Sequence, residues 1–163
     1  MGNETEQPVA VSRRIEAPAD RIFGILADPA RHPDLDGSGM LRAGGSNAVV
    51  SGLGDVFVMK MHHPAMGDYE MDNHVVQYEV DRRIGWEPVA HGEARGAESP
   101  QRNGSRWMYA LTPEGPDATM VTESYDCSGS PESVRQAVDN GNSWIEAMAT
   151  TLERLDEVST GEQ

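Results

Sequence analysis

Two segments with the composition of β-strands each carry a pair of ionisable side chains two positions apart, and this spacing suits acid–base chemistry. The first segment carries Asp72 and His74, and the second carries Glu123 and Tyr125. Alternate residues of a strand share one face of a sheet, so each pair can line a wall of a cavity. Burial raises the pKa of a carboxyl group and lowers that of an imidazole, which brings both toward the range useful for proton transfer. We therefore predict Glu123 and His74 as candidate catalytic residues.

Apolar and aromatic side chains accompany this acid–base set, and they would form the wall of a ligand cavity if the same strand faces point inward. The predicted ligand-binding residues are Phe57, Met59, Met61, Asp72, Trp86, Trp107, Tyr109, Tyr125, Trp144 and Met148. Nine methionines against two phenylalanines also fit an adaptable apolar cavity, because methionine is flexible and polarisable. Core packing of the aromatic rings, and simple hydrogen bonding by Glu123 and His74, are the alternative interpretations.

Metal ligation finds less support in the sequence. His62 and His63 are adjacent, so on a strand they point to opposite faces and cannot both ligate one ion without distortion. A loop site from His32, Asp34 and Asp36 is the other arrangement, but solvation and helix-end hydrogen bonds explain these side chains more simply. The chain has no His-Glu-x-x-His motif, no cysteine pair and no EF-hand spacing. No metal site is predicted.

Nucleophilic and cofactor-dependent chemistry have no recognisable motif. Cys127 is the single cysteine, and its place near the end of a strand is typical of a small buried apolar residue. The chain contains no Gly-x-Ser-x-Gly elbow and no glycine-rich turn between a strand and a helix. We expect no cofactor.

Composition excludes several classes of partner. Lys plus Arg number 13 and Asp plus Glu number 27, giving a net charge of −14. The scattered basic residues argue against nucleic-acid binding, and the acidity argues against an anionic membrane surface. The chain starts with a polar segment rather than a signal peptide, and no apolar run approaches the roughly 18 residues of a membrane span. With one cysteine no intramolecular disulfide can form, so we expect a cytoplasmic protein, without stable membrane insertion, as a monomer or homodimer.

The elements that would position these residues follow a simple order. Strand signals recur at residues 8–15, 40–43, 54–62, 68–80, 84–90, 105–112 and 118–127, separated by tight turns. Two short helices are predicted after the first strand, from Ala17 and from Asp28. A long helix beginning near Ser130 carries an apolar stripe at spacings of three and four, formed by Val134, Val138, Gly141, Ile145, Met148, Leu152 and Leu155.

This order predicts an α+β domain in which a curved antiparallel sheet of about seven strands wraps one long C-terminal helix. A bent sheet cannot touch a straight helix along its whole length, so the gap between them becomes a cavity. We expect a single domain over residues 8–157, with flexible ends at 1–7 and 158–163 and a loop at 92–104.

Five segments together carry a resemblance to a known superfamily. They are residues 15–23 (IEAPADRIF), 26–33 (LADPARHP), 32–39 (HPDLDGSG), 82–88 (RRIGWEP) and 118–123 (ATMVTE). Their order and spacing resemble the START-like, SRPBCC superfamily, and residues 32–39 look like an actinobacterial branch in which many members carry a tryptophan near Leu35. The resemblance implies the helix-grip fold of plant pollen allergens, lipid-transfer domains and aromatic polyketide cyclases.

Three functions are compatible with this fold, which hosts unrelated activities. The leading expectation is binding of a hydrophobic or aromatic small molecule, polyketide- or lipid-like, in the internal cavity. The second is a cofactor-independent cyclase or dehydratase that uses Glu123 and His74. The third is an interaction module such as a chaperone-ATPase activator, which an exposed apolar patch would favour.

Overall fold

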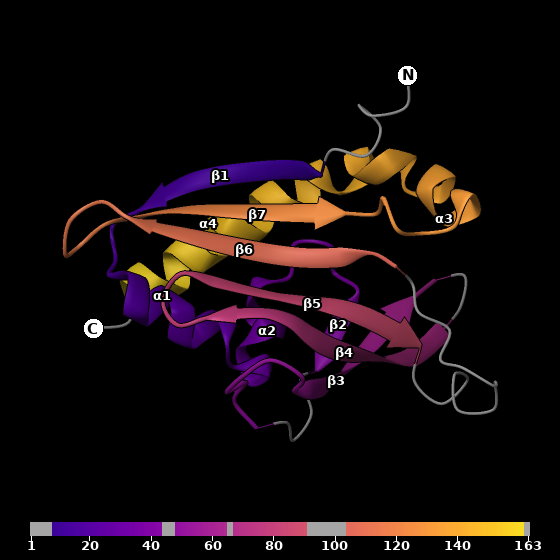
Figure 1. Ribbon diagram of the computed structural model, residues 1–163, viewed down its shortest axis with the longest axis horizontal. Helices are drawn as coiled ribbons and strands as arrows, with labels where there is room; N and C mark the ends of the chain where they lie inside the picture. Colours follow the sequence, from indigo (N-terminus) through magenta and orange to yellow (C-terminus); the bar gives the residue numbers. More distant parts are fainter. Residues whose placement is uncertain (1–7, 44–47, 65–66, 91–103, 162–163) are drawn as a thin grey trace.

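The structure is a computed structural model that describes residues 8–43, 48–64, 67–90 and 104–161. The predicted flexible segment 1–7 and all but the last residue of the predicted loop 92–104 lie outside these ranges. Seven strands form one antiparallel sheet in the order β1-β7-β6-β5-β4-β3-β2 (Figure 1). The strands are β1 (Val9–Ile15), β2 (Leu41–Ala43), β3 (Val56–His63), β4 (Gly67–Glu79), β5 (Arg83–Ala90), β6 (Arg106–Pro113) and β7 (Thr119–Asp126).

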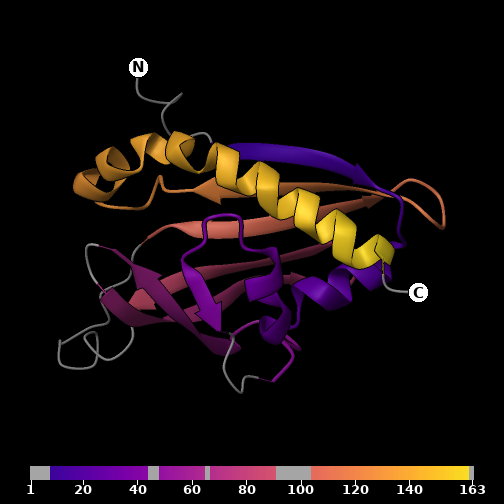
Figure 2. The ribbon, with the colours of Figure 1, turned by 180° about the vertical axis from the view of Figure 1, so that it is seen from behind.

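The helices lie on one face of this sheet. Between β1 and β2 come α1 (Ala19–Leu26), the 3-10 turn η2 (Pro29–Arg31) and α2 (His32–Leu35). The chain ends in α3 (Glu132–Ala137), the 3-10 turn η4 (Asp139–Trp144) and α4 (Ile145–Gly161). In Figure 2, α4 crosses the sheet over β1 and β7, with α1 and α2 beside it. This arrangement confirms the predicted helix-grip α+β fold.

β7 shows why the alternating pattern is a dependable guide to this sheet. Its burial alternates strictly, with Thr119, Val121, Glu123 and Tyr125 buried and the residues between them partly exposed. A strand presents successive side chains to opposite faces, and the apolar character of Val121 and Tyr125 selects the inner face. Glu123 is therefore carried to the interior by its neighbours.

β4 departs from strict alternation at a β-bulge. Val75 is opposite Trp86 in β5, whereas Gln77 is opposite Gly85, so β4 holds one extra residue, Val76, between these pairs. A bulge re-aims the side chains on either side of it. Val75 and Tyr78, three residues apart, consequently both pack against the core.

The C-terminal segment is not the continuous helix that its apolar stripe predicts. Asp139, Asn140 and Gly141 have φ values of 54°, 54° and 96°, which break the helix between α3 and α4. Asn and Gly adopt this left-handed conformation at the least cost, and a Cβ on Gly141 would lie 3.0 Å from Tyr125 and Val9. The prediction of one helix from Ser130 is therefore wrong. Ile145, predicted in the stripe, is 41% exposed.

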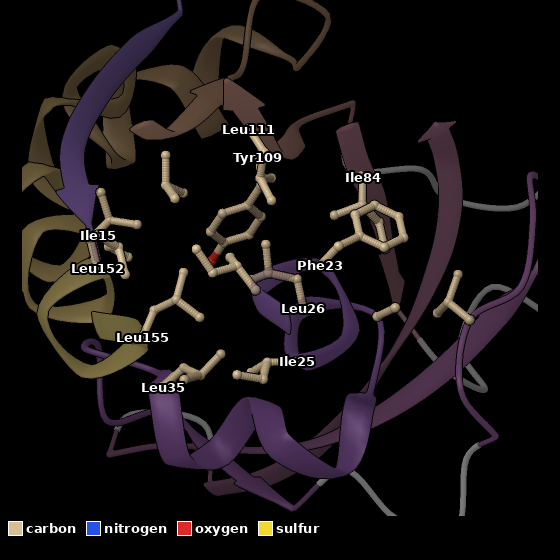
Figure 3. Packing of buried hydrophobic residues seen from close by; sticks show 14 of the residues in the cluster. Ile15, Phe23, Ile25, Leu26, Leu35, Ile84, Tyr109, Leu111, Leu152 and Leu155 are labelled. Carbon is tan, nitrogen blue, oxygen red and sulfur yellow. The ribbon is translucent and has the colours of Figure 1, made fainter. Parts of the chain in front are cut away.

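The main core lies between the sheet, α1 and the C-terminal half of α4. α1 contributes four buried apolar residues at helical spacing, namely Ile22, Phe23, Ile25 and Leu26. Figure 3 shows Phe23, Ile25 and Leu26 converging with side chains from the sheet, α2 and α4, including Ile15, Leu35, Ile84, Tyr109, Leu111, Leu152 and Leu155. This packing fixes α4 at one end of the sheet and leaves its other end free to border a cavity.

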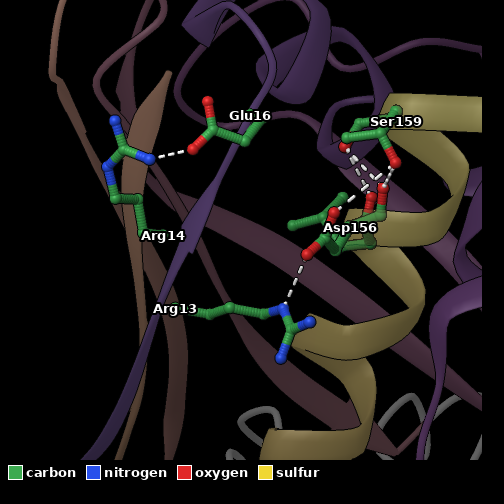
Figure 4. A network of polar contacts seen from close by, with 7 residues as sticks. Arg13, Arg14, Glu16, Asp156 and Ser159 are labelled. Atoms are coloured by element: carbon green, nitrogen blue, oxygen red, sulfur yellow. Dashed lines mark hydrogen bonds and ion pairs between the residues drawn. The ribbon is translucent and has the colours of Figure 1, made fainter.

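Polar contacts attach α4 to β1 at the periphery. Arg13 Nε donates to Asp156 Oδ2 at 2.8 Å, and Arg14 pairs with Glu16 beside it (Figure 4). Ser159 is fully buried and donates to the Leu155 carbonyl oxygen at 2.7 Å. Residues 158–161 belong to α4 and residues 162–163 lie outside the described residues, so the flexible end expected at 158–163 stays a prediction.

Candidate functional site

A cavity of about 240 Å³ lies between the concave face of the sheet and the N-terminal half of α4. It is bordered by α2 and the loop after it, by the inner faces of β3 to β7, and by α4. Its wall is mostly apolar and rich in methionine, with Met40, Met59, Met61, Met71 and Met148 among the lining residues. The small side chains Ala147 and Thr151 face it from α4. The cavity is slightly smaller than the roughly 300–1,000 Å³ usual for drug-sized ligands, which favours a small ligand.

Glu123 is the acidic group in the inner wall of this cavity. It is only 3% exposed, and its Oε1 has no hydrogen-bond partner among the residues that the structure describes. Burial raises the pKa of this carboxyl to about 8, although the hydrogen-bonding hydroxyl of Tyr109 lowers it and the negative charge of Asp36 raises it further. At neutral pH Glu123 is consequently a mostly protonated carboxylic acid in an apolar wall.

Tyr109 supports this carboxyl from the neighbouring strand. It stands directly opposite Glu123 in the β6–β7 register, and both residues line the cavity. Burial, with the adjacent charge of Glu123, raises the pKa of the Tyr109 hydroxyl well above its ordinary value. The phenol therefore stays neutral and can donate a hydrogen bond at any pH at which the protein is studied.

His32 reaches the cavity from the start of α2. Its Nε2 is 2.7 Å from the Leu26 carbonyl oxygen, and because a carbonyl only accepts, Nε2 carries the proton and Nδ1 is left as an acceptor. The ring stacks on Trp86 with centroids 5.1 Å apart and meets Phe57 edge-on at 5.5 Å. Burial is the main effect on its pKa and lowers it, so the imidazole is neutral.

The loop after α2 closes one side of the cavity. Asp36 lines it, and its carboxylate accepts hydrogen bonds from the Ser38 backbone N–H at 3.0 Å and the Leu41 N–H at 2.9 Å. The next residue, Gly37, touches α4, where a Cβ would lie 2.2 Å from the Ala147 carbonyl oxygen. Only glycine fits this contact, which seats the loop directly on α4.

Nine of the twelve sequence-predicted site residues lie on the cavity wall. They are Phe57, Met59, Met61, Trp86, Trp107, Tyr109, Glu123, Trp144 and Met148. Tyr125 is buried behind this wall, with its ring 4.5 Å from that of Trp107 and 6.2 Å from that of Trp144. The structure thus brings the predicted aromatic set together around Glu123.

Asp72 and His74 do not line the cavity, so the expected pairing of His74 with Glu123 is wrong. Their neighbours Met71 and Asn73 face it instead. The apolar parity of Val76 and Tyr78 had assigned Asp72 and His74 to the inner face, but the bulge at Val76 reverses parity between Tyr78 and the residues before the bulge. The error is one residue in register.

Sequence reasoning also missed several wall residues. They include His32 and Asp36, for which the sequence suggests only metal ligation or a solvated loop, and Asn73, which no pattern in the sequence singles out. A short motif such as His-Pro-Asp-Leu-Asp does not indicate that the helix it forms, α2, lies at the cavity. Among the described ranges, no cluster of three or more His, Cys, Asp or Glu side chains is arranged to hold a metal ion. Cys127 is buried, as predicted.

Comparison with curated proteins finds similarity to the uncharacterized protein Rv0088 of Mycobacterium tuberculosis, 31% identical over 122 residues. The match covers 73% of this chain but only 48% of the relative, so the chain spans about half the length of the curated relatives it matches. No protein-family model matches the chain. None of the helices in the described ranges is long and apolar enough to cross a lipid bilayer.

Solved structures are similar over nearly the whole chain. Protein NE0264 of Nitrosomonas europaea has a TM-score of 0.70 at 16% identity, covering 96% of each chain. Norcoclaurine synthase of Thalictrum flavum, in complex with dopamine and hydroxybenzaldehyde, has a TM-score of 0.58 at 14% identity, covering 96% of this chain and 88% of the synthase. At such identities the likeness concerns the fold, and the chain shares with these proteins a curved antiparallel sheet closed by a C-terminal helix.

Proposed function

We propose that this protein binds a hydrophobic or aromatic small molecule in the cavity between the sheet and α4. The observation that carries the proposal is the cavity itself, whose wall combines five methionines, three tryptophans and a buried carboxyl group. Apolar cavities with a few placed polar groups are the usual ligand sites of small domains. A polyketide-like ligand fits this wall better than a long lipid chain, because the cavity volume is only about 240 Å³.

One comparison supports this proposal. Norcoclaurine synthase, which shares the fold, was solved with the small aromatic molecules dopamine and hydroxybenzaldehyde bound. The similarity to the Mycobacterium tuberculosis protein supports the separate expectation that the chain belongs to an actinobacterial branch.

The test is to fill the cavity without disturbing its surroundings. Ala147 lines the cavity from α4, whereas Ala149 is exposed on the same helix. We expect Ala147→Trp to abolish binding of small aromatic ligands, measured by calorimetry and by ligand-induced thermal stabilisation, while Ala149→Trp keeps it. Native mass spectrometry of the protein from its own host should show a bound small molecule. Equal binding by both variants, or no ligand for the wild-type protein, would contradict the proposal.

A second candidate function is a cofactor-independent cyclase or dehydratase, favoured by the protonated state of Glu123. A carboxylic acid with a pKa of about 8 in an apolar wall can donate its proton to an enolate oxygen as that charge develops. Tyr109, rather than His74, is the neighbour positioned to help. Turnover of small polyketones by the wild-type protein but not by Glu123→Gln would support this activity, and turnover kept by the variant would remove Glu123 from it.

A further inference from the structure

The described wall of the cavity carries two carboxyl groups, one imidazole and no ammonium or guanidinium group. Asp36 and Glu123 are its carboxyl-bearing residues, and no Lys or Arg lines it in the part of the chain that the structure describes. A carboxylate or phosphate brought into this cavity would lose its hydration and meet no positive partner, which is costly. The charge distribution therefore disfavours anionic ligands such as fatty acids.

Glu123 Oε1 lacks the hydrogen-bond partner that a buried carboxyl oxygen requires. Asp36 is satisfied by the loop that holds it, through Ser38 and Leu41. By contrast, Oε1 of Glu123 has no partner among the described residues although the residue is only 3% exposed. A buried polar atom without a partner destabilises a folded protein. A ligand that donates a hydrogen bond would pair this oxygen in the ionised carboxylate.

Aromatic rings line the same cavity as this carboxyl. All three tryptophans of the chain, Trp86, Trp107 and Trp144, line the cavity. Trp107 is the diagonal cross-strand neighbour of Glu123, since it stands opposite Tyr125 in the β6–β7 register. Its ring packs edge-to-face on Trp144 with centroids 5.6 Å apart. Tryptophan faces attract organic cations more strongly than other aromatic side chains do.

We propose that the ligand of this cavity is an amine in its protonated form, whose ammonium group donates a hydrogen bond to Glu123 Oε1 while its apolar body lies against the tryptophans. The inference rests on the proposed small-molecule function and specifies its ligand class. It combines the unpaired buried oxygen, the absence of Lys and Arg from the described wall and the aromatic lining.

Binding of such a ligand is linked to pH through one proton. The titratable groups that line the cavity with Glu123 are Tyr109 on β6, Asp36 and His32 at α2, and Tyr69 on β4. Tyr109 is neutral and His32 is held neutral by burial, so Glu123 is the group that responds. An ammonium group stabilises its ionised form, and below pH 8 binding must therefore release a proton. Affinity should rise by up to about tenfold per pH unit between pH 6 and 8.

The experiment compares three probes of similar shape: 2-phenylethylamine, 2-phenylethanol and 3-phenylpropanoate. Calorimetry at pH 6 and pH 8, in buffers of different ionisation enthalpy, measures both affinity and protons released. We expect the amine to bind at least tenfold more tightly at pH 8 than at pH 6, to release close to one proton at pH 6, and to bind more tightly than the other two probes.

Glu123→Gln keeps the shape of the side chain and removes its charge. This variant should lose the pH dependence and at least tenfold of the amine affinity at pH 8, with binding of 2-phenylethanol changed less than about threefold. Glu146→Gln removes a carboxylate from the exposed face of α4. This control should leave the amine affinity and its pH dependence unchanged. Wild-type protein that binds the alcohol as tightly as the amine, at both pH values, overturns the amine inference and leaves small-molecule binding intact. Binding of none of the probes, in a protein that also fails to acquire a ligand in its host, counts against both.

Discussion

Glu123 shows how a polar residue reaches a protein interior without a partner of its own. Strict alternation in β7 carries it inward between Val121 and Tyr125, and the surrounding wall is apolar. Its carboxyl group therefore exchanges water for the hydroxyl of Tyr109 and leaves one oxygen unpaired. Such uncompensated groups are rare in folded proteins and cluster at functional sites. The residue therefore lowers the stability of the fold, and the proposed ligand would offset part of that cost by donating a hydrogen bond to it.

Stability should depend on pH through Glu123, and the sign can be stated. Its pKa is raised from 4.5 in a solvated chain to about 8 in the folded protein. The folded state therefore keeps a proton that the unfolded state loses above pH 4.5, and stability falls as pH rises through this interval. We expect the difference in unfolding free energy between the wild-type protein and Glu123→Gln to shift against the wild type by at most about 1.4 kcal/mol per pH unit between pH 5 and 8.

Denaturant unfolding of both proteins at three pH values measures this effect. The difference cancels contributions from other titrating groups, His32 included, because both proteins carry them. A difference that stays constant from pH 5 to 8 would mean that Glu123 ionises at its ordinary pKa in the folded protein.

At the scale of single elements, the sequence predicts best those strands in which inward and outward residues alternate regularly. β7 alternates along its whole length and β3 alternates over residues 56–60, so the inward positions of Glu123, Phe57 and Met59 follow from the pattern alone. β4 is different, because its bulge leaves no motif and depends on pairing with β5. A pattern read through the bulge assigns Asp72 and His74 to the wrong face. Periodicity along one strand cannot indicate a β-bulge, because the pairing with the neighbouring strand determines where the bulge forms.

The predicted start of the C-terminal helix at Ser130 is wrong for a related reason. The apolar stripe continues from Val138 to Gly141 across Asp139 and Asn140, so the periodicity alone gives no sign of the break there. Gly141 was counted as part of the stripe, but it is buried because the chain bends there and packs against Tyr125 and Val9. The signal that could have marked the break is the Asp-Asn-Gly sequence itself, which favours turns.

The break between α3 and α4 should be sensitive to substitution at Gly141. With φ at 96° and a Cβ position 3.0 Å from Tyr125 and Val9, Gly141→Ala should destabilise the fold by roughly 1–3 kcal/mol. Asn140→Gly is the matched control, because Asn140 has φ at 54° and glycine adopts that conformation freely. It should change stability by less than about 1 kcal/mol in chemical denaturation. Equal effects of the two substitutions would argue against a fixed bend.

At the scale of the whole molecule, α4 packs into the core along one half of its length and borders the cavity along the other half. The C-terminal half of α4 closes on α1 and β1 through Leu152 and Leu155, and the N-terminal half borders the cavity through Ala147 and Met148. α3 lies beyond the bend and buries no residue. Because α3 has no buried side chain, little packing holds it in place.

Hydrogen exchange should reveal this division. Amides of α3 should exchange by local opening, with protection far below that of the β7 and C-terminal α4 amides, which belong to the core. Peptide-level exchange followed by mass spectrometry can resolve residues 132–137 from residues 151–161. Comparable protection in both segments would show that the bend is packed as firmly as the core.

The extra residue of β4 has a consequence for the way this cavity can change by mutation. Loss of the single codon for Val76 would remove the bulge and restore strict alternation along β4, while the pairs on either side of it, Val75 with Trp86 and Gln77 with Gly85, would keep their register. Met71 and Asn73 would then stay on the cavity wall, and Asp72 and His74 would stay off it. The bulge is therefore a position at which this strand can lose one residue without exchanging the side chains that line the cavity.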